Sequence, residues 1–445
     1  MKRTILLLFV SLIINSLKAQ TDSERLNEVM QAATDANIFN GVALVARHDS
    51  ILLFKGYGWR DYEQKIPHDT NSVFQIGSVT KTFTATVILW LQEQHQLNIQ
   101  DKLSKYFPKY RYADKITIKN LLTHTSGIYN FTDAHYLADL AEKPFRQTDF
   151  WNYIADKPLG FPPDSMHSYS NSNYMILGYI IEKVSGKPYE QMVREVIFDK
   201  AGMTHSGFDY AHLSSPYKSV GYDALNETTH QRARISDSSA TYAAGAIYTT
   251  AGDLYRWNLA LYGNKIVSQA SLEEAFTPYK GTYGYGWYIE QPPGMKFVAH
   301  NGGIWGFQAH FKRILQDHGC IILLRNEMLG FEDYALSLHR IIQHDPNYYI
   351  PRKSISIPAD SLSAYVGEYQ LAGKPAFKAS VTVREGNLYI AWTNFAPEQV
   401  FAEKKDWFFF KSYNSQIEYT RNEKGGISGF VAHNGKQEFP YEKIR

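Results

Sequence analysis

The sequence predicts an α+β domain followed by a small all-β domain, and three observations support this prediction. Apolar, strand-like runs begin soon after residue 40, helical periodicity dominates the middle of the chain, and strand-like runs return before and after a proline-rich stretch near residue 345. Early and late strands that flank a helical insertion are expected to share one antiparallel sheet. A chain of 445 residues is also too long for one ordinary core.

The composition describes a folded protein without an evident macromolecular partner. Hydrophobic residues make up 44% and charged residues 20% of the chain, which is typical of a globular protein. The 46 basic and 44 acidic side chains leave a net charge of +2, which gives no electrostatic argument for a nucleic-acid or acidic-membrane partner. The 32 tyrosines fit β-rich regions and an aromatic-lined cleft.

The first twenty residues, "MKRTILLLFVSLIINSLKAQ", predict export. Lys2 and Arg3 form a basic start, the apolar run Ile5 to Ile14 has the length of a signal-peptide core, and Ala19 offers a cleavage point before Gln20. The run is too short to span a bilayer as a helix, and an uncleaved anchor is the alternative. We therefore expect residues 1–20 to be a signal peptide, the mature protein to be periplasmic or extracellular, and no stable membrane span.

The single cysteine, Cys320, excludes an intramolecular disulfide, and no cysteine near the cleavage point could take a lipid. Its apolar surroundings, "GCIILLRN", predict a small buried side chain in a strand. The chain contains no phosphate-binding glycine loop, HExxH motif or paired-cysteine spacing. We expect no metal and no other cofactor.

The elements of the first domain can be predicted in chain order. "GVALVAR" and "SILLFKGYGW" predict a hairpin that turns at His48-Asp49. "TKTFTATVILWLQEQHQ" predicts a buried helix, and "NYMILGYIIEKVSGKPYEQMVREVIF" predicts two helices separated by Gly186 and Pro188. "YGWYIE", "KFVAH", "AHFKRILQ" and "CIILLRN" predict late strands, the last two joined by a turn at Asp317-His318-Gly319.

The stretch "HDPNYYIPRKSISIPADS" carries three prolines and no clear period, which predicts a linker. Short strands with frequent turn signals follow, as in "KASVTVREGNLYIAW" and "QIEYTRNEKGGISGFVAHNGKQEF", and predict an all-β sandwich or barrel. We place the first domain at residues 21–345, the linker at 346–360 and the accessory domain at 361–445.

Ser78 and Lys81 are the first candidates for chemistry. In "FQIGSVTKTFTATVILW", Gly77 permits a sharp turn and Ser78 stands at the first turn of the following helix, so the i and i+3 side chains share a face. Burial in an apolar helix lowers the pKa of a lysine, so its amine can be neutral and can take the proton of a serine nucleophile. The alternative is a helix-capping serine with a solvated lysine, and Ser215-Pro216-Tyr217-Lys218 fits the same spacing.

Tyr169-Ser170-Asn171 precedes another buried helix. A phenol near Lys81 could carry a proton to a leaving group, and the Asn171 amide could hold a substrate carbonyl while bonding the lysine. The alternative is an aromatic residue followed by a capping asparagine, and Tyr262-Gly263-Asn264 has the same pattern.

The string "FVAHNG" occurs twice, at residues 297–302 and 430–435. In the first copy we expect His300-Asn301-Gly302 to close a strand, with His300 facing the cleft as a donor or weak cation and the Gly303 N–H beside that of Ser78 as an oxyanion donor. In the second copy, Asn434-Gly435 lies between two short strand runs and predicts a two-residue hairpin turn without a function.

Taken together and in order, these motifs resemble the serine β-lactamase and penicillin-binding-protein superfamily, especially class C β-lactamases, DD-carboxypeptidases and related esterases. The matching stretches are "GSVTKTFTA", "NLLTHTSGI", "YSNSNYMILGYIIE", "AAGAIYTTAGDLYRW" and "HNGGIWGF", and the resemblance covers most of the chain. It implies a β-lactamase/DD-peptidase-like α+β fold, in which an antiparallel sheet is flanked by helices and joined to a helical subdomain. The C-terminal domain is similar to small barrel-like modules appended to some of these hydrolases.

The resemblance implies a role for each candidate. Ser78 would be the acylated nucleophile, Lys81 its general base and Tyr169 the proton relay. The Ser78 and Gly303 N–H groups would form the oxyanion hole, while Asn171, His300 and Asn301 would bind substrate. No pattern suggests the dedicated glutamate of class A enzymes, so deacylation would depend on Tyr169 and Lys81.

His300 stands where the family most often has lysine, and free histidine has a pKa near ~6.5. A substrate carboxylate would be held less surely, so ester or D-amino-acid peptide hydrolysis ranks ahead of antibiotic hydrolysis. The sequence thus predicts a secreted serine hydrolase acting on a small-molecule or peptide substrate, with a cell-wall origin as one option. A true class C-like β-lactamase or DD-carboxypeptidase is the alternative, and a non-catalytic cell-wall-binding protein is an alternative of another class. The sequence gives no prediction of the oligomeric state.

Overall fold

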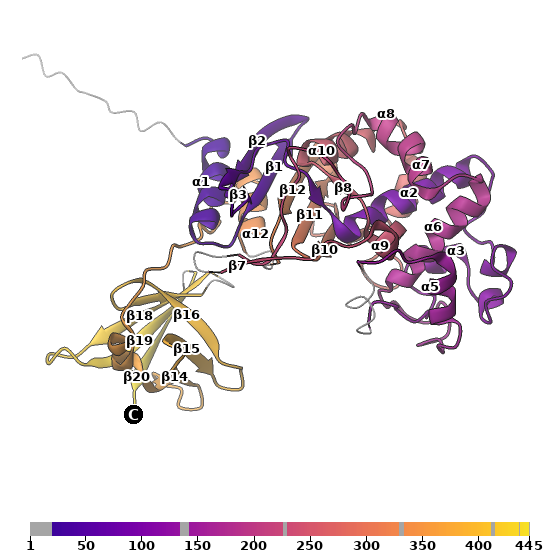
Figure 1. Cartoon of the computed structure of the whole chain (residues 1–445). Helices are drawn as coiled ribbons and strands as arrows, with labels where there is room; N and C mark the ends of the chain where they lie inside the picture. Colours follow the sequence, from indigo (N-terminus) through magenta and orange to yellow (C-terminus); the bar gives the residue numbers. More distant parts are fainter. Residues whose placement is uncertain are drawn as a thin grey trace, which may run out of the picture.

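The computed structural model describes residues 20–133, 142–225, 229–328, 333–410, 414–435 and 437–444. It contains an α+β domain and a separate closed barrel, which confirms both parts of the predicted fold (Figure 1). Residues 1–19, which hold most of the predicted signal peptide, lie outside the described residues. Within the described residues, no helix combines the length and the apolar character that a bilayer crossing needs.

One six-stranded antiparallel sheet organises the first domain, in the order β2-β1-β12-β11-β10-β9. Its strands come from both ends of the domain, as predicted, because the early hairpin pairs with the late strand β12 through β1. The strands are β1 (Gly41–Arg47), β2 (Ser50–Tyr57), β9 (Tyr288–Glu290), β10 (Phe297–Ile304), β11 (Phe307–Ile314) and β12 (Gly319–Arg325).

The predicted turns join these strands because their residues tolerate left-handed backbone. His48 and Asp49 have φ values of 49° and 59°, as expected for a two-residue turn that follows the twist of its strands. A 3-10 turn, Leu315–Asp317, and His318 with φ 52° connect β11 to β12.

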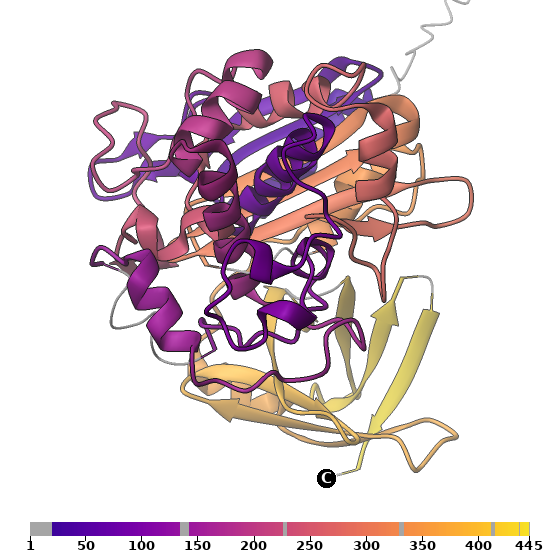
Figure 2. The same ribbon diagram turned by 90° about the vertical axis from the view of Figure 1, so that its right-hand side faces the viewer.

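Both faces of the sheet are covered, because alternate side chains of β1 enter two different cores. Ala43 and Val45 pack with α1 (Asp22–Asp35) and α12 (Asp333–Ile342). Val42, Leu44 and Ala46 face the larger core on the helical side. The helices of this side stand in front of the sheet in Figure 2.

The helices on this side come mainly from the long insertion between β2 and β9. They are α2 (Thr80–Glu93), α3 (Ile118–Leu122), α5 (Gln147–Ile154), α6 (Asn171–Ser185), α7 (Tyr189–Val193), α8 (Asp199–Ala201), α9 (Ser238–Gly245), α10 (Ala251–Ala260) and α11 (Gln269–Ala275). Gly186, with φ 69°, ends α6 where the sequence predicts a break. The second predicted helix is divided: a π-helical segment, Arg194–Phe198, separates α7 from α8.

Short strands and 3-10 turns complete the domain and connect these helices. They are β3 (Trp59–Asp61), β4 (Ile66–Pro67), β5 (Phe74–Gln75), β6 (Tyr222–Leu225), β7 (His230–Arg232), β8 (Tyr248–Thr249), η1 (Gly77–Val79), η2 (Leu103–Lys105) and η3 (Ala113–Lys115).

The accessory domain is a closed eight-stranded barrel rather than a sandwich, and each strand pairs with its neighbours in the chain. Its interior is filled, with Tyr369, Phe408, Ile417, Tyr419 and Phe430 in one core. A short helix, α13 (Ala359–Leu362), precedes β13 (Gly367–Leu371), β14 (Lys378–Arg384), β15 (Asn387–Trp392), β16 (Glu398–Lys404), β17 (Trp407–Phe409), β18 (Ser415–Arg421), β19 (Ile427–Asn434) and β20 (Gln437–Lys443).

Candidate active site

Ser78 lies in a tight turn between a strand and a buried helix. β5 leads into the 3-10 turn η1, and α2 begins at Thr80. Gly77 has φ 49°, and a side chain there would approach the Gly303 nitrogen to 2.8 Å, so the turn requires glycine. The turn continues directly into α2 and brings the Lys81 Nζ to 2.9 Å from the Ser78 Oγ.

Lys81 is completely buried and has three polar neighbours. Its Nζ lies 2.9 Å from the Ser78 Oγ, 2.8 Å from the Asn171 Oδ1 and 2.7 Å from the Ala244 carbonyl oxygen. Burial holds the pKa of Lys81 well below its usual range. A neutral amine has two N–H groups and one lone pair. Since the Asn171 and Ala244 oxygens can only accept, they take the two N–H groups and leave the lone pair facing the Ser78 hydroxyl.

Tyr169 reaches Ser78 from a different element. The Tyr169 hydroxyl donates to the Ser78 Oγ at 2.9 Å, from the residue just before the N-cap of α6. Burial raises the pKa of Tyr169 above its ordinary value, so the phenol keeps its proton at neutral pH. The candidate base, Lys81, and the candidate proton donor, Tyr169, therefore contact the same serine oxygen.

Asn171, the first residue of α6, joins Lys81 to a loop. Its Oδ1 accepts from Lys81, and its Nδ2 donates to the Thr132 Oγ1 at 2.9 Å. The Asn171 backbone N–H donates to the Asn130 Oδ1 at 2.8 Å. The second Nδ2 proton is available for a substrate carbonyl.

His300 and Asn301 differ from the sequence expectation. β10 does not close at His300-Asn301-Gly302 but runs on to Ile304. His300 is 2% exposed; its Nδ1 lies 2.6 Å from the Asn301 carbonyl and must donate to it, so its Nε2 accepts from the Tyr283 hydroxyl at 3.0 Å. Burial lowers the pKa of His300 to about 3, so the ring is neutral rather than a weak cation. The Asn301 Oδ1 lies 2.7 Å from the His310 Nδ1.

Gly302 and Gly303 let β10 pack closely against the turn that carries Ser78. A side chain on Gly302 would overlap the Ile76 carbonyl and come within 3.1 Å of the Ser78 nitrogen. A side chain on Gly77 would come within 2.8 Å of the Gly303 nitrogen, whereas a side chain on Gly303 would meet no atom within 4 Å. The Ser78 and Gly303 amides therefore lie together at the edge of an open space, as two oxyanion donors would.

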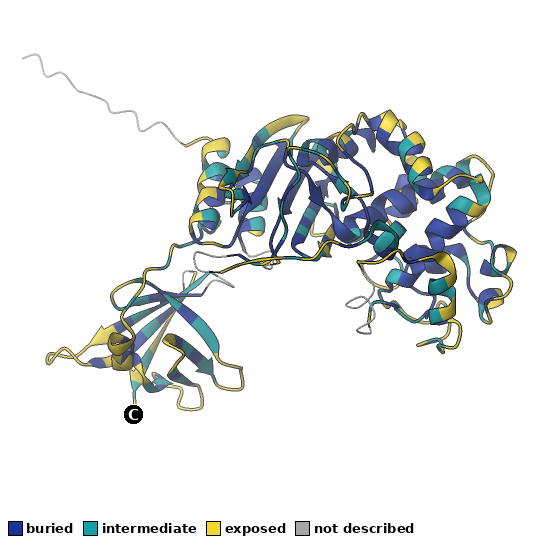
Figure 3. Cartoon of the chain, viewed as in Figure 1, coloured by how far each residue is buried: buried dark blue, intermediate teal, exposed yellow. Residues whose placement is uncertain are grey.

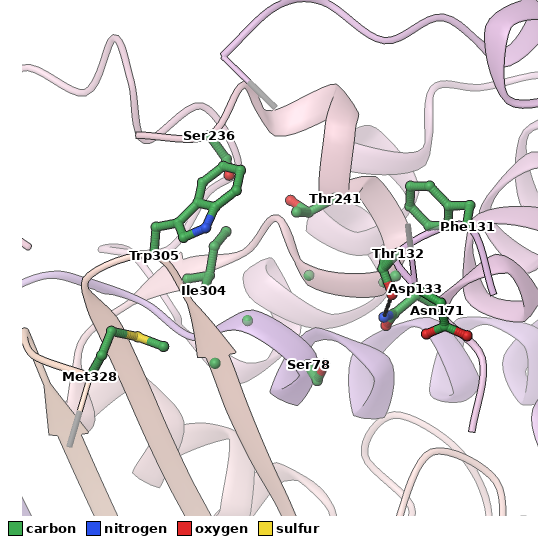
Figure 4. Close-up of a pocket in the computed structure, with 14 residues that line it drawn as sticks. Ser78, Phe131, Thr132, Asp133, Asn171, Ser236, Thr241, Ile304, Trp305 and Met328 are labelled. Carbon is green, nitrogen blue, oxygen red and sulfur yellow. Dashed lines mark hydrogen bonds between the residues drawn. The ribbon is translucent and has the colours of Figure 1, made fainter. Parts of the chain in front are cut away.

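That space is a cleft of about 570 Å³ (Figure 4). Figure 4 shows Phe131, Thr132, Asp133 and Asn171 on one side and Ile304, Trp305 and Met328 on the other, with Ser78 between them. Its complete lining is Gly77, Ser78, Phe131, Thr132, Asp133, Asn171, Ser236, Thr241, Ala244, Gly245, Gly303, Ile304, Trp305 and Met328. Tyr169, His300 and Asn301 are not part of it.

Sequence reasoning missed several of these residues. Trp305 lies within the matching stretch "HNGGIWGF", and Thr132 directly follows "NLLTHTSGIYNF", so membership of a motif or proximity to one was a usable signal. Ser236, Thr241 and Met328 lie outside the motifs, and only the fold brings them to the cleft.

His124 was also missed, although it lies within the motif "NLLTHTSGI". Its ring packs against that of Tyr169 with 4.4 Å between centroids, and the Ser170 backbone N–H donates to its Nδ1 at 3.2 Å. Burial lowers the pKa of His124 well below its ordinary value. A neutral His124 ring thus packs against the Tyr169 ring.

The competing sequence matches do not form comparable sites. The Lys218 Nζ donates to the Ala211 carbonyl, and the Asn264 Oδ1 accepts from the Gln269 backbone N–H. His433 lies in the barrel, where Asn434 is still part of β19 and pairs with Gln437 of β20, so β19 and β20 form the expected hairpin but its turn comes after Asn434 rather than at Asn434-Gly435. A hairpin is therefore confirmed for the second "FVAHNG", and its lack of a function stays a prediction.

Comparisons with known proteins agree with the geometry. Residues 26–341 match the family model described as Beta-lactamase, and residues 351–445 match a domain of unknown function, DUF3471. The chain is 39% identical over 252 residues to a putative penicillin-binding protein PbpX of Bacillus subtilis, covering 56% of this chain and 62% of that protein.

Two further relatives extend the comparison. Penicillin-binding protein 4* of Bacillus subtilis is 27% identical over 450 residues, which cover 94% of this chain and 98% of the relative. A teichoic acid D-alanine hydrolase of Staphylococcus aureus is 30% identical over 277 residues, which cover 61% of this chain and 66% of the relative.

Solved structures share the fold. A penicillin-binding protein from Bacillus halodurans superposes with a TM-score of 0.62 at 25% identity, covering 70% of this chain and 97% of that one. The octameric penicillin-binding protein homologue from Pyrococcus abyssi superposes with a TM-score of 0.67 at 20% identity, covering 94% of this chain and 99% of that one.

Proposed function

The chain belongs to the beta-lactamase family of serine hydrolases, and we propose that it is an exported enzyme that cleaves an ester or amide through an acyl-enzyme on Ser78. The contact that carries this proposal is the one between Lys81 and Ser78. The buried Lys81 Nζ lies within hydrogen-bond distance of the Ser78, Asn171 and Ala244 oxygens. In the neutral amine, the Asn171 and Ala244 oxygens accept the two N–H groups, and the lone pair is left for the serine hydroxyl.

In the proposed acylation step, Lys81 takes the Ser78 hydroxyl proton as the Oγ bonds to the substrate carbonyl carbon. The Ser78 and Gly303 N–H groups stabilise the oxyanion. The bond to the leaving group then breaks, and the leaving group takes the Tyr169 proton. The Lys81 ammonium returns its proton to the Tyr169 oxygen, which restores both residues to their neutral forms.

Deacylation uses the same groups. Water attacks the acyl carbon while the Tyr169 and Lys81 pair accepts a proton, and the Ser78 oxygen regains a proton as the acid product leaves. Of the two groups, Lys81 is the better base in the resting enzyme. Burial favours the neutral form of each, and the neutral lysine has a lone pair beside Ser78.

The charges of the residues that line the cleft support a substrate without a carboxylate near the reacting bond. A cation, the Arg234 guanidinium, lies outside this lining, 4.6 Å from the centroid of the Trp305 ring. Among the described residues that line the cleft, Asp133 is the only ionisable side chain. His300 is buried and neutral, so His300-Asn301-Gly302 offers no cation to a penicillin or a D-Ala-D-Ala stem. An ester or amide of an amino acid with a free ammonium group suits Asp133 better, and the teichoic acid D-alanine hydrolase relative supports this substrate class. A β-lactamase or DD-carboxypeptidase activity is the second candidate, because two relatives are named as penicillin-binding proteins.

We also propose the division of the chain expected from its sequence. Residues 1–20 would be a signal peptide, 21–345 the hydrolase domain, 346–360 a linker and 361–445 an accessory domain. The family matches over residues 26–341 and 351–445 support two domains. Export is supported by the signal-like start and by relatives named for penicillin binding and for teichoic acid.

Labelling with a fluorophosphonate tests the nucleophile. The purified protein should be labelled, Ser78→Ala should not be, and Ser215→Ala, at the competing match, should be labelled as the wild type is. Equal labelling of Ser78→Ala would refute the assignment. A protein that retains peptidoglycan without labelling or turnover would instead be a binding protein.

A substrate panel tests the class. We expect turnover of p-nitrophenyl and D-alanyl esters to exceed that of a D-Ala-D-Ala peptide and of a chromogenic cephalosporin. The reverse order, abolished by Ser78→Ala, would keep the serine mechanism but select the second candidate.

A further inference from the structure

The two most exposed large hydrophobic side chains among the described residues lie in the barrel. Phe395 is 73% exposed and Phe377 is 55% exposed. Phe377 ends the turn between β13 and β14, at residues 372–377, and Phe395 lies in the turn between β15 and β16, at residues 393–397. An exposed phenylalanine alone needs no explanation, but two on adjacent turns form a patch.

The two turns are fixed side by side. The Thr393 backbone N–H donates to the Lys378 carbonyl at 3.0 Å, and the Lys378 backbone N–H donates to the Thr393 Oγ1 at 2.7 Å. Each turn is closed by its own bond: Phe377 N–H donates to the Lys374 carbonyl and Phe395 N–H to the Trp392 carbonyl. The rings are therefore presented together by ordered backbone.

The charge of this patch differs from that of the whole protein. The two turns, each taken with the residue that follows it, are "AGKPAFK" and "TNFAPE". They include two lysines and one acidic residue, the half-buried Glu398, and so carry a net charge of +1. Lys374 and Lys378 are both exposed. The near balance of charge over the full chain hides this local combination of aromatic rings and cations.

The patch also points away from the catalytic domain. In a barrel of chain-neighbour strands, successive turns alternate between the two ends. The intervening turn, Glu385–Gly386, lies at the other end, where Gly386 lines a cavity together with Asp35 and Asp223 of the hydrolase domain. The exposed turns of the barrel are visible at its ends in Figure 3.

We propose that residues 372–378 and 393–397 form a membrane-contact tip that binds reversibly to an anionic phospholipid surface. The Phe377 and Phe395 rings enter the interface between headgroups and acyl chains, and Lys374 and Lys378 pair with lipid phosphates. Apolar rings flanked by cations suit this surface, whereas a neutral glycan would leave the lysines without partners. The proposal is independent of the hydrolase assignment and gives the accessory domain a role.

Sedimentation of the full chain with phosphatidylglycerol–phosphatidylcholine vesicles tests this proposal. We expect binding that weakens with salt, and Phe377→Ser/Phe395→Ser should lower the partition coefficient at least about tenfold, since two apolar rings no longer leave water. Lys374→Gln/Lys378→Gln should remove the preference for anionic over neutral vesicles. Met166→Ser, which alters a 52% exposed side chain of the other domain, is the matched control.

Unchanged thermal unfolding and unchanged hydrolysis of a soluble ester would show that the double variants are folded. Failure of the wild-type protein to bind anionic vesicles would overturn the proposal, and so would binding of Phe377→Ser/Phe395→Ser as strong as that of the wild type. Binding to isolated peptidoglycan, but not to vesicles, with loss in the same variants would assign the tip to a polysaccharide instead.

Discussion

The backbone of Gly302 lies directly against the Ile76 carbonyl, with no room for a side chain between them. Gly302 does not have a positive φ, so close approach rather than backbone conformation explains the glycine. This contact holds β10 against the turn that carries Ser78. It makes the alignment of the two proposed oxyanion donors depend on a residue that bears no side chain.

Gly302→Ala is expected to weaken both the fold and the site. Its methyl group must push β10 away from the serine turn, at a cost of about 1–3 kcal/mol of unfolding free energy, and fluorophosphonate labelling should slow as the Ser78 and Gly303 amides separate. Gly303→Ala is the matched comparison, because its methyl group meets no atom within 4 Å and should leave the melting temperature unchanged. Equal melting temperatures and labelling rates for Gly302→Ala and wild type would contradict this account.

Lys81→Met should change how stability depends on pH. Because burial depresses the pKa of Lys81 in the folded protein, the unfolded chain binds the extra proton between that lowered pKa and the unfolded value near ~10.4. Wild-type stability relative to Lys81→Met should therefore rise with pH across this window, by up to about 1.4 kcal/mol per pH unit, and level off above it. Urea unfolding of both proteins from pH 7 to pH 10.5 measures the difference. A difference that does not vary with pH would mean that Lys81 is charged in the folded state.

Acid should destabilise the protein through its buried histidines. Burial lowers the pKa of His300 and of His68 to about 3, whereas the unfolded value is near ~6.5. The unfolded chain then binds more protons as pH falls below 6.5, so stability present above that pH is lost progressively down to pH 3. At pH 5 each of these histidines should cost about 2 kcal/mol. His300→Gln should lose about that much less than wild type between pH 7 and pH 5 in urea titrations, and equal losses would refute the neutral buried ring.

The fold could be predicted largely from the sequence because its signals are local. Alternating strand runs, the glycine that ends α6 and the His48-Asp49 turn each act within a few residues. The divided helix after Pro188 could not be predicted, because apolar periodicity does not distinguish a continuous helix from one with a π-helical segment.

Contacts in the candidate site could be predicted where they depend on the spacing of residues in the sequence. They were missed where they depend on how distant segments pack together. Ser78 and Lys81 are three residues apart, and their contact follows from the serine turn and the helix that it enters. The burial of His300 depends on Tyr283 and on the sheet, so its neutral state could not be derived from "HNGG". Trp305 and Ser236 share a cleft only because the helical insertion folds back on the sheet.

The two "FVAHNG" copies supply a direct comparison within one chain. His300 accepts from the Tyr283 hydroxyl, and its ring lies 6.3 Å from that of Tyr169, so His300→Ala removes packing next to the residue proposed as the proton relay. A small displacement of a catalytic group can cost about 10²-fold in rate, and we expect kcat/KM on a p-nitrophenyl ester to fall at least about tenfold. His433 stacks on Trp407 in the barrel, with its Nε2 3.3 Å from the Glu418 carboxylate. His433→Ala should therefore keep wild-type kcat/KM even if it lowers the melting temperature of the barrel, and equal kinetic penalties for the two variants would show that the copies had been assigned wrongly.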